Sequence, residues 1–236
     1  MVLKGFSNSR EQANSILMTG NVFVDNKRVE KPGQQVSQNS KIEIKGKTHP
    51  WVSRGGIKLN KALQEFNLDC NSIVALDIGA STGGFTDVLL ANGASKIYAV
   101  DVGYGQLDWK LRQDERVIVK EKTNARYLTH EIIEDPLDAL VCDASFISLK
   151  KVLPSGLGLI KSNGWLVALI KPQFEVGKGL VGKGGVVRDP KQHQSVINDI
   201  REWLEFEMKM NVLGVIESPI LGPSGNREFL IVAEKN

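Results

Sequence analysis

Four charged side chains are predicted to meet at one edge of the fold. The apolar run at residues 165–170 has the pattern of a buried strand, and it ends on Lys171 followed by a proline. Asp143 ends the preceding apolar run, Glu228 begins the last one, and Lys58 lies on a predicted helix. A lone lysine at a strand tip could simply extend its amine into water. Two amines and two carboxylates on one rim instead indicate a site that orients and deprotonates a polar group of a substrate.

The elements that would position these side chains alternate between strand and helix. We expect a helix at residues 57–66 and others near residues 84–92, 127–134, 149–161 and 190–210. Strands are expected at residues 73–78, 96–101, 117–120, 139–143, 166–171, 212–217 and 228–233. This alternation predicts an α/β fold of the Rossmann-like class, with a mostly parallel seven-stranded sheet and helices on both faces. The last two strands are expected to be antiparallel, so that Glu228 starts at the edge where the parallel strands end.

A glycine-rich turn follows the first of these strands in the segment "LDIGASTGGFTDVLL". In a doubly wound sheet, ligands bind beyond the carboxyl ends of the strands, and the first strand-to-helix turn is the preferred place. Gly79, Gly83 and Gly84 are expected to let a ligand approach the backbone. The second strand ends at Asp101, whose carboxylate can accept hydrogen bonds from ribose hydroxyls.

Three ligands compete for this turn. A dinucleotide site needs G-x-G-x-x-G, which the spacing here does not supply. The segment "GKGLVGKG" at residues 177–184 is close to a phosphate-binding loop, but Gly184 stands where that loop needs Ser or Thr, and no helix follows directly. The turn D-x-G-x-x-x-G-G-F followed by an acidic second strand resembles the S-adenosylmethionine site of Rossmann-like methyltransferases. An ordinary structural turn is the remaining alternative.

The first part of the chain is basic. Residues 1–61 carry 11 Lys/Arg against 4 Asp/Glu, whereas residues 62–236 carry 19 against 23, which suggests a small polyanion-binding module attached to a larger body. The stretch "SREQANSILMTGNVFVDNKRVEKPG" predicts a helix, a strand and a turn at Asp25-Asn26, and a further strand is expected at Ile42 and Ile44, beyond this stretch. This order of elements resembles an S4-type RNA-binding module. We expect this module at residues 1–46, shortened at its start, a linker at residues 47–53 in which Trp51 pins the joint, and the larger domain at residues 54–236.

The quartet Lys58, Asp143, Lys171 and Glu228 resembles the tetrad of FtsJ-like RNA ribose 2′-O-methyltransferases. Together with the S4-type module, the motifs "SRGGIKL", "DIGASTGGFTD", "DASFISL" and "IKPQFE" resemble the TlyA family over essentially the whole chain. The resemblance implies S-adenosylmethionine-dependent methylation of cytidine 2′-hydroxyls in ribosomal RNA, with no metal required. The tetrad would be catalytic. The implied cofactor contacts are Asp77, Gly79, Ala80, Ser81, Gly83, Phe85, Asp101, Asn124 and Ala144.

Two roles are open for Lys171. A ribose hydroxyl is a poor nucleophile, so its proton must leave as the oxygen attacks the methyl group. Lys171 could take that proton only as a neutral amine, a form that burial and Lys58 favour and that Asp143 and Glu228 oppose. Alternatively, a charged Lys171 orients the hydroxyl and stabilises developing negative charge. In both cases, aligning oxygen, methyl carbon and sulfur supplies much of the rate.

Further basic residues are expected to contact RNA. The glycine-rich segment "EVGKGLVGKGGVVRDPKQH" is predicted to be a mobile loop that clamps the RNA backbone, or else a solvated loop without a partner. The predicted RNA contacts are Arg10, Lys27, Arg28, Lys31, Lys178, Lys183 and Arg188.

Composition favours a cytoplasmic protein, and the family resemblance implies ribosomal RNA and ribosomal subunits as its partners. No uncharged apolar stretch of membrane-spanning length and no signal peptide is found in the sequence, and Cys70 and Cys142 are expected to be buried thiols. Two other functions stay open. One is an RNA-binding or assembly protein without catalysis. The other is a membrane-perturbing hemolysin, which the lack of a strongly basic amphipathic helix disfavours.

Overall fold

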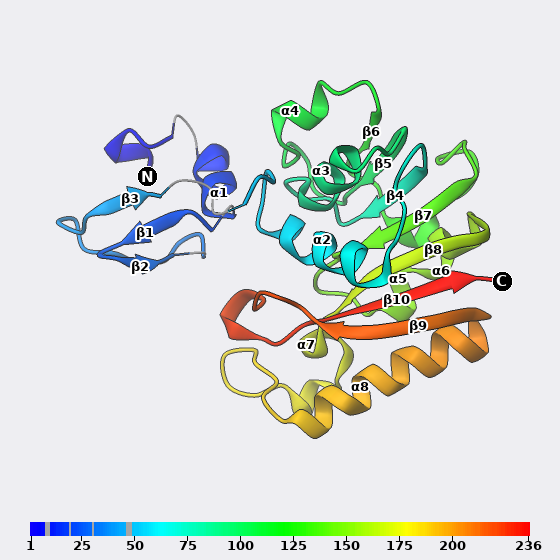
Figure 1. The fold of residues 1–236 in the computed structure, drawn as a ribbon. Helices are drawn as coiled ribbons and strands as arrows, with labels where there is room; N and C mark the ends of the chain where they lie inside the picture. Colours follow the sequence, from blue (N-terminus) through cyan, green and yellow to red (C-terminus); the bar gives the residue numbers. More distant parts are fainter. Residues whose placement is uncertain (8–9, 19, 30, 46–48) are drawn as a thin grey trace.

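The computed structural model describes residues 1–236 except residues 8–9, 19, 30 and 46–48, and the side chains of Glu11, Gln12, Ser15, Lys178 and Pro223 are also outside the described part. Two sheets organise the chain (Figure 1). The smaller has three strands in the order β2-β1-β3, and the larger has seven strands in the order β6-β5-β4-β7-β8-β10-β9.

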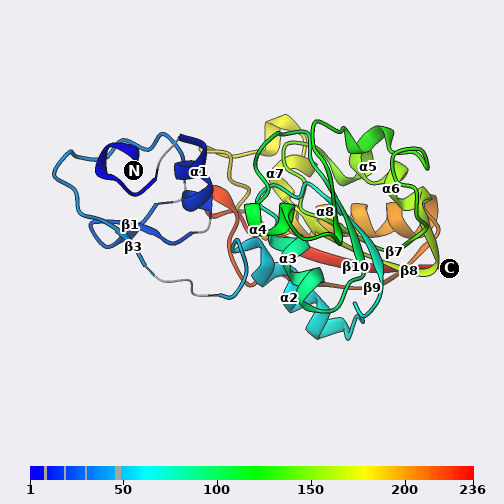
Figure 2. The same ribbon diagram turned by 90° about the horizontal axis from the view of Figure 1, so that it is seen from above.

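The three-stranded sheet and one helix make up the N-terminal part of the chain. Helix α1 (Arg10–Met18) precedes β1 (Val22–Val24), β2 (Lys27–Arg28) and β3 (Ile42–Ile44), and β1 pairs antiparallel with both neighbours. Asp25 and Asn26 have φ of 48° and 63°, the left-handed pair that a tight hairpin turn requires, as predicted. Leu17, Val22, Val24 and Val29 form a small core of their own. This part lies beside the larger one when the molecule is seen from above (Figure 2).

The seven-stranded sheet confirms the predicted fold class. Its strands are β4 (Val74–Ile78), β5 (Lys96–Val100), β6 (Val117–Lys120), β7 (Leu137–Cys142), β8 (Ile160–Ile170), β9 (Met210–Glu217) and β10 (Phe229–Lys235). All neighbouring strands from β6 to β8 are parallel, while β10 is antiparallel to both β8 and β9. Four consecutive residues of β4 are buried, as expected for a central strand that is covered on both faces.

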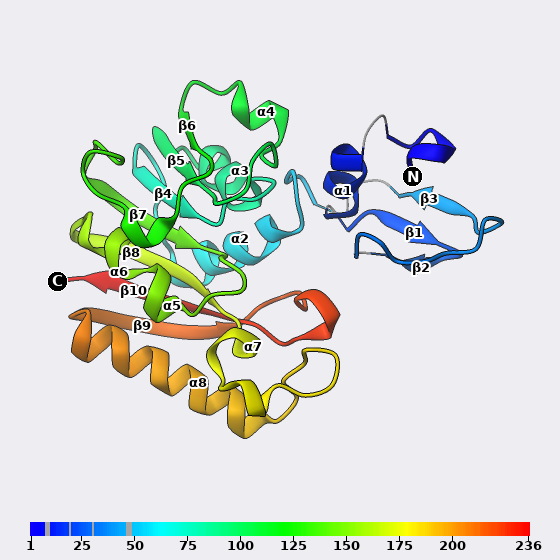
Figure 3. The same cartoon turned by 180° about the vertical axis from the view of Figure 1, so that it is seen from behind.

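Helices cover both faces of this sheet. One face packs against α2 (Gly55–Phe66), α3 (Gly84–Ala91) and α4 (Trp109–Arg112). The other face packs against α5 (Leu149–Val152), α6 (Pro154–Gly158) and α8 (Pro190–Glu202), as the view from behind shows (Figure 3). Helix α7 (Pro172–Glu175) is a single turn after β8. Because a buried cluster lies on each face, the sheet is a rigid layer that fixes where its strand ends lie.

Two predicted helices are wrong. Residues 127–134 hold only the end of a 3-10 turn (Ala125–Tyr127), since Leu128 takes extended angles and stops the helix. Leu128 and Ile133 are still buried in the core. The apolar spacing that suggested a helix here therefore comes from buried residues of a non-helical segment. The helix predicted at residues 149–161 breaks at Pro154, which has no N–H to continue it, and β8 already begins at Ile160.

The joint between the two parts begins in residues outside the described range. From residue 49 onward the chain runs against α2 and α3. A Cβ on Gly56 would lie 2.4 Å from Trp51 Cγ, so the indole packs directly on the first turn of α2. Val52 N donates a hydrogen bond to Asp87 Oδ2 at 2.8 Å.

Candidate active site

The topology brings the four predicted charged residues to one place. Lys58 lies on the first turns of α2, Asp143 follows β7 and Lys171 follows β8. Glu228 precedes β10, whose Phe229 pairs with Ile170 of β8, so the antiparallel strand starts where the parallel ones end, as predicted. Lys58 Nζ lies 2.8 Å from Glu228 Oε2 and 3.5 Å from Asp143 Oδ2, and Lys171 Nζ lies 2.7 Å from Asp143 Oδ1. The four side chains therefore form one chain of alternating charge.

Three of the four charged side chains are buried, so each of them depends on an oppositely charged partner. Glu228 is 0% exposed, Lys58 5% and Lys171 6%. Burial lowers the pKa of Lys58, but the carboxylates of Asp143 and Glu228 outweigh it and raise that pKa above its ordinary value. Burial raises the pKa of Asp143, but the ammonium groups of Lys58 and Lys171 together hold it below its ordinary value. Lys58 and Asp143 are therefore both charged at neutral pH.

Lys171 Nζ has one ion-pair partner and two hydrogen-bond acceptors. Besides the Asp143 carboxylate, its Nζ donates to Asp143 O at 3.1 Å and to Ser145 Oγ at 2.7 Å. A carboxylate 2.7 Å from an amine favours the charged form of that amine. These contacts therefore favour the second of the two roles considered above, in which a charged amine orients the hydroxyl.

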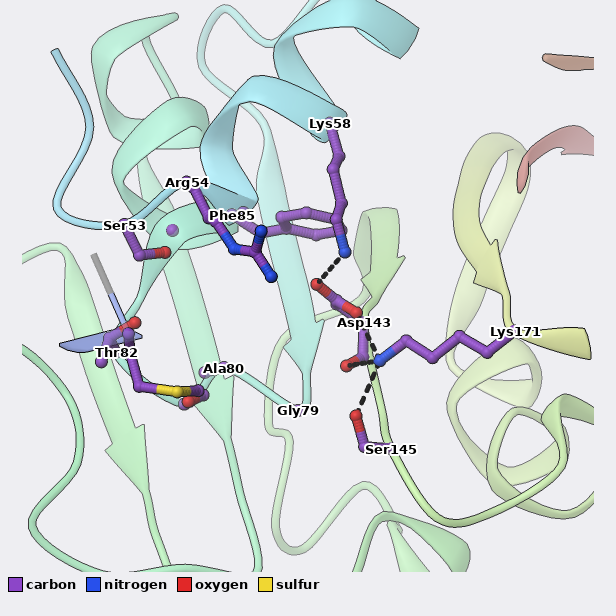
Figure 4. A pocket seen from close by; sticks show the side chains of 14 residues that line it. Ser53, Arg54, Lys58, Gly79, Ala80, Thr82, Phe85, Asp143, Ser145 and Lys171 are labelled. Carbon is purple, nitrogen blue, oxygen red and sulfur yellow. Dashed lines mark hydrogen bonds and ion pairs between the residues drawn. The ribbon is translucent and has the colours of Figure 1, made fainter. Parts of the chain in front are cut away.

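A cavity of about 150 Å³ lies between the charged cluster and the glycine turn (Figure 4). The side chains of Lys58, Asp143 and Lys171 line one part of it, and Gly79 and Ala80 line another. The predicted cofactor contacts that line the cavity are Gly79, Ala80, Ser81 and Phe85. The predicted contacts placed outside its lining are Asp77, Gly83, Asp101, Asn124 and Ala144.

The glycines of the turn have a packing role in addition to the ligand approach predicted for them. A Cβ on Gly79 (φ +80°) would lie 2.9 Å from Ala144 Cα, and one on Gly83 (φ +93°) would lie 2.1 Å from Leu111 Cδ1. On Gly84 it would lie 2.3 Å from Ser53 Oγ. Side chains at these positions would thus collide with the protein itself. The glycines allow close packing of the turn against neighbouring segments, and this packing shapes the cavity.

Asp77 and Asp101 hold the turn through hydrogen bonds. Asp77 Oδ2 accepts from Thr86 N at 3.0 Å and from Thr86 Oγ1 at 2.7 Å, which fixes the start of α3. Burial, followed by the repulsion of Asp143 and Asp101, raises the pKa of Asp77 to about 7 despite these bonds. Asp101 accepts from Ser81 N at 2.9 Å and from Gly103 N at 2.7 Å.

Asn124 is turned toward its own 3-10 turn. Its Oδ1 accepts from Arg126 N at 3.2 Å and from Arg126 Nε at 3.3 Å, so the side chain caps that turn. The cap engages the Oδ1 of Asn124 and leaves its Nδ2 as the group that could contact a cofactor.

The residues of the turn fit a nucleoside cofactor that carries a sulfonium. Gly79, Ala80 and Ser81 present backbone along the cavity, and Asp143 supplies a carboxylate at its charged end. Each carboxylate oxygen of Asp101 retains a second lone pair that can accept from a ribose hydroxyl.

Several residues of the cavity carried no signal that sequence reasoning used. Ser145 lies three residues beyond the end of β7, and Arg54 directly precedes α2; their places in the motifs "DASFISL" and "SRGGIKL" were the available clue. Figure 4 shows Arg54 extending toward Asp143, and Ser145 beside Lys171. The unpredicted lining residues are Met18, Ser53, Arg54, Gly55, Thr82 and Ser145, whereas Gly84, expected to admit a ligand at the turn, lines the cavity.

The predicted RNA contacts lie on the surface. The side chains that the structure describes as exposed are Arg10, Lys27, Arg28, Lys31, Lys183 and Arg188, and the side chain of Lys178 is outside the described part. The glycine-rich segment was expected to be mobile. That mobility stays a prediction; in the structure, residues 182–187 form a small hairpin, with Gly182 bridged to Val186 and Val187 N donating to Asn226 Oδ1 at 3.1 Å.

The sheet order, the glycine turn after β4 and the cavity that joins it to the charged cluster define a Rossmann-like methyltransferase. Comparison with known sequences agrees: residues 51–235 match the FtsJ-like methyltransferase family, and residues 1–42 match the S4 domain. The chain belongs to the FtsJ-like methyltransferase family.

Relatives extend over nearly the whole chain. It is 46% identical to the 16S/23S rRNA (cytidine-2′-O)-methyltransferase TlyA of Mycobacterium tuberculosis, across 98% of this chain and 86% of that protein. It is 39% identical to Hemolysin A of Brachyspira hyodysenteriae, across 96% and 94% of the two chains. A solved structure from Streptococcus thermophilus, 43% identical, superposes with a TM-score of 0.79 over 99% of this chain and 86% of that chain. Within the described residues, no helix has the length and apolar character needed to cross a membrane.

Proposed function

We propose that this protein transfers the methyl group of S-adenosylmethionine to a ribose 2′-hydroxyl, that of a cytidine, in ribosomal RNA. The observation that carries the proposal is the buried cluster of Lys58, Asp143, Lys171 and Glu228 at one end of the cavity next to the glycine turn. The M. tuberculosis relative is a 16S/23S rRNA (cytidine-2′-O)-methyltransferase, which supports the choice of cytidine and of ribosomal RNA.

The cofactor would be held by the turn at Gly79–Ser81, with Asp101 at its ribose. When bound, S-adenosylmethionine supplies an electrophilic methyl group. Lys171 directs the ribose oxygen toward the cavity and stabilises the negative charge that develops on it as its proton departs to water. Asp143 keeps Lys171 in place, and Lys58 and Glu228 keep Asp143 in place through the pairs described above. Orientation of the two reacting atoms is then the main contribution of the protein.

The N-terminal part would bind the RNA. Its exposed basic residues and its S4-domain match support this assignment, with residues 1–46 as the RNA-binding module and residues 54–236 as the methyltransferase domain. Ribosomal subunits are then the partners, and the protein acts in the cytoplasm where they are assembled.

Methyl transfer to unmodified ribosomal subunits tests the proposal. Wild-type protein is expected to transfer labelled methyl groups, and Lys171→Ala to lose at least a hundredfold in rate while still binding the cofactor. The control is Lys209→Ala, which removes an exposed lysine at the opposite end of the sheet. Wild-type protein that binds RNA without transferring methyl groups would leave the non-catalytic RNA-binding function in its place.

A further inference from the structure

A second cavity lies between the segment that precedes α8 and the loop that joins β9 to β10. Its volume is about 300 Å³. In Figure 1 these two segments, yellow and orange-red, lie one above the other beside the start of α8. The cavity is lined by Val186, Val187, Arg188, Pro190, His193, Ser224, Gly225 and Arg227.

Asn226 fixes the two walls relative to each other. Its side chain is 3% exposed, its Oδ1 accepts from Val187 N at 3.1 Å, and its Nδ2 donates to Gly185 O at 2.9 Å. Its own carbonyl accepts from Gly222 N at 2.9 Å within the β9–β10 loop. One buried amide therefore joins both segments, and the cavity is formed before any ligand arrives.

The floor of the cavity is equally ordered. His193 is 5% exposed, its Nε2 is hydrogen-bonded to Val187 O at 2.9 Å, and its ring lies 5.5 Å from that of Phe229. Asp189 caps α8 by accepting from Lys191 N at 2.9 Å, and Pro190 occupies the first position of the helix. These contacts hold the backbone next to Arg188.

The charges at the cavity favour an anion. Arg188 comes from one wall and Arg227 from the other, and both side chains are exposed. Arg227 Nε lies 3.6 Å from Glu217 Oε1. The side chains of Arg227 and Glu217 are 59% and 50% exposed, so solvent screens this ion pair and it is weak. Arginine is suited to bind phosphate, because the phosphate oxygens accept paired N–H bonds from one guanidinium group, and each wall of this cavity supplies one arginine.

The position of the cavity links it to the charged cluster. Arg227 directly precedes Glu228, and the same loop covers that carboxylate: a Cβ on Gly222 would lie 2.1 Å from Glu228 Oε1. A group bound between the two arginines is therefore one loop away from the site where the acceptor hydroxyl would lie.

We propose that this cavity binds a backbone phosphate of the RNA substrate, close to the nucleotide that is methylated. The inference rests on the proposed function and adds a defined contact to it. The two arginines would fix the register of the strand without reading its sequence, which is the usual role of phosphate contacts.

The test measures binding of unmodified ribosomal subunits by wild-type protein and by Arg188→Gln/Arg227→Gln, over a range of monovalent salt at constant Mg²⁺. The double variant is expected to bind about tenfold more weakly at low salt. The slope of log K against log salt should fall by about one to two. Cofactor affinity and the rate at saturating subunits should stay as in the wild type. Arg201→Gln/Lys209→Gln, at the far ends of α8 and β9, makes the same change in net charge and should leave affinity and slope unaltered.

The outcomes separate this inference from the proposed function. A double variant that binds subunits as tightly as the wild type, with the same salt slope, overturns the phosphate site and leaves the methyltransferase intact. An equal loss in the control variant overturns it too, since net charge alone would then explain the effect. Wild-type protein that neither binds nor methylates the subunits refutes the proposed function and this site together. If the double variant fails to fold, Arg188→Gln alone, at an exposed position, gives the same readout.

Discussion

The buried pair of Lys58 and Glu228 predicts a specific pattern of stability losses. In Lys58→Met, the fully buried Glu228 carboxylate keeps one side-chain donor within the described residues, Gln173 Nε2 at 3.5 Å. Removing one partner of a buried ion pair costs about 3–5 kcal/mol. For a chain of this length that loss lowers Tm by roughly 10 °C. Glu228→Gln should cost less, about 1–3 kcal/mol, because Lys58 keeps Asp143 at 3.5 Å.

Urea unfolding of wild type, both single variants and the double variant Lys58→Met/Glu228→Gln measures the coupling. We expect the double variant to be more stable than the sum of the single losses by about 2 kcal/mol or more, since neither charge is then left unpaired. Methyl transfer should be lost in all three variants, because the double variant restores packing without restoring the support of Asp143. Losses that add to within about 0.5 kcal/mol would refute the coupling between these residues.

Three further predictions concern single positions. The pKa of Asp77 is about 7 in the folded state against an ordinary 3.8, so the folded state keeps a proton that the unfolded state loses, and stability falls as pH rises between these values. In urea unfolding, Asp77→Asn should therefore raise the free energy of unfolding little at pH 4 and by about 4 kcal/mol at pH 8. A gain in stability independent of pH would contradict this. Ser145→Ala should lower kcat about tenfold with KM unchanged, because it removes an acceptor of Lys171, and Ser145→Thr should recover most of the lost rate. A threonine variant as slow as the alanine variant would contradict a role for the Ser145 hydroxyl. Gly79→Ala should lower the free energy of unfolding by about 2–3 kcal/mol and weaken cofactor binding in calorimetry. Gly184→Ala, at nearly the same φ but in open space, should lower it by only about 1 kcal/mol. Equal losses of stability would show that backbone strain decides, and not the contact with Ala144.

The sheet and the meeting of charged residues were predictable because both follow from strand order. Buried runs such as residues 165–170 identify strands by composition alone, and parallel strands must end at one edge. Once Lys171 and Asp143 were placed at strand ends, the antiparallel last strand brought Glu228 to them. No detail of side-chain packing was needed for that conclusion.

Other features depended on contacts that a sequence pattern does not contain. The segment at residues 127–134 has helical spacing but takes its shape from the cap of Asn124 and from the burial of Ile133. Ser145 was missed because a serine after a strand end has no periodic signature. The reason for Gly79 was also missed, since its neighbour Ala144 is 65 residues away in the chain and only the fold brings the two together.

The central claim is tested most directly by nucleoside mass spectrometry of ribosomal RNA. Unmodified subunits would be incubated with the protein and S-adenosylmethionine, digested, and compared with the same reaction carried out with Lys171→Ala. The account predicts that 2′-O-methylcytidine appears at a defined nucleotide with wild-type protein and is almost absent with the variant. A methyl group on a base, or equal 2′-O-methylation by the variant, would contradict the role given to the charged cluster.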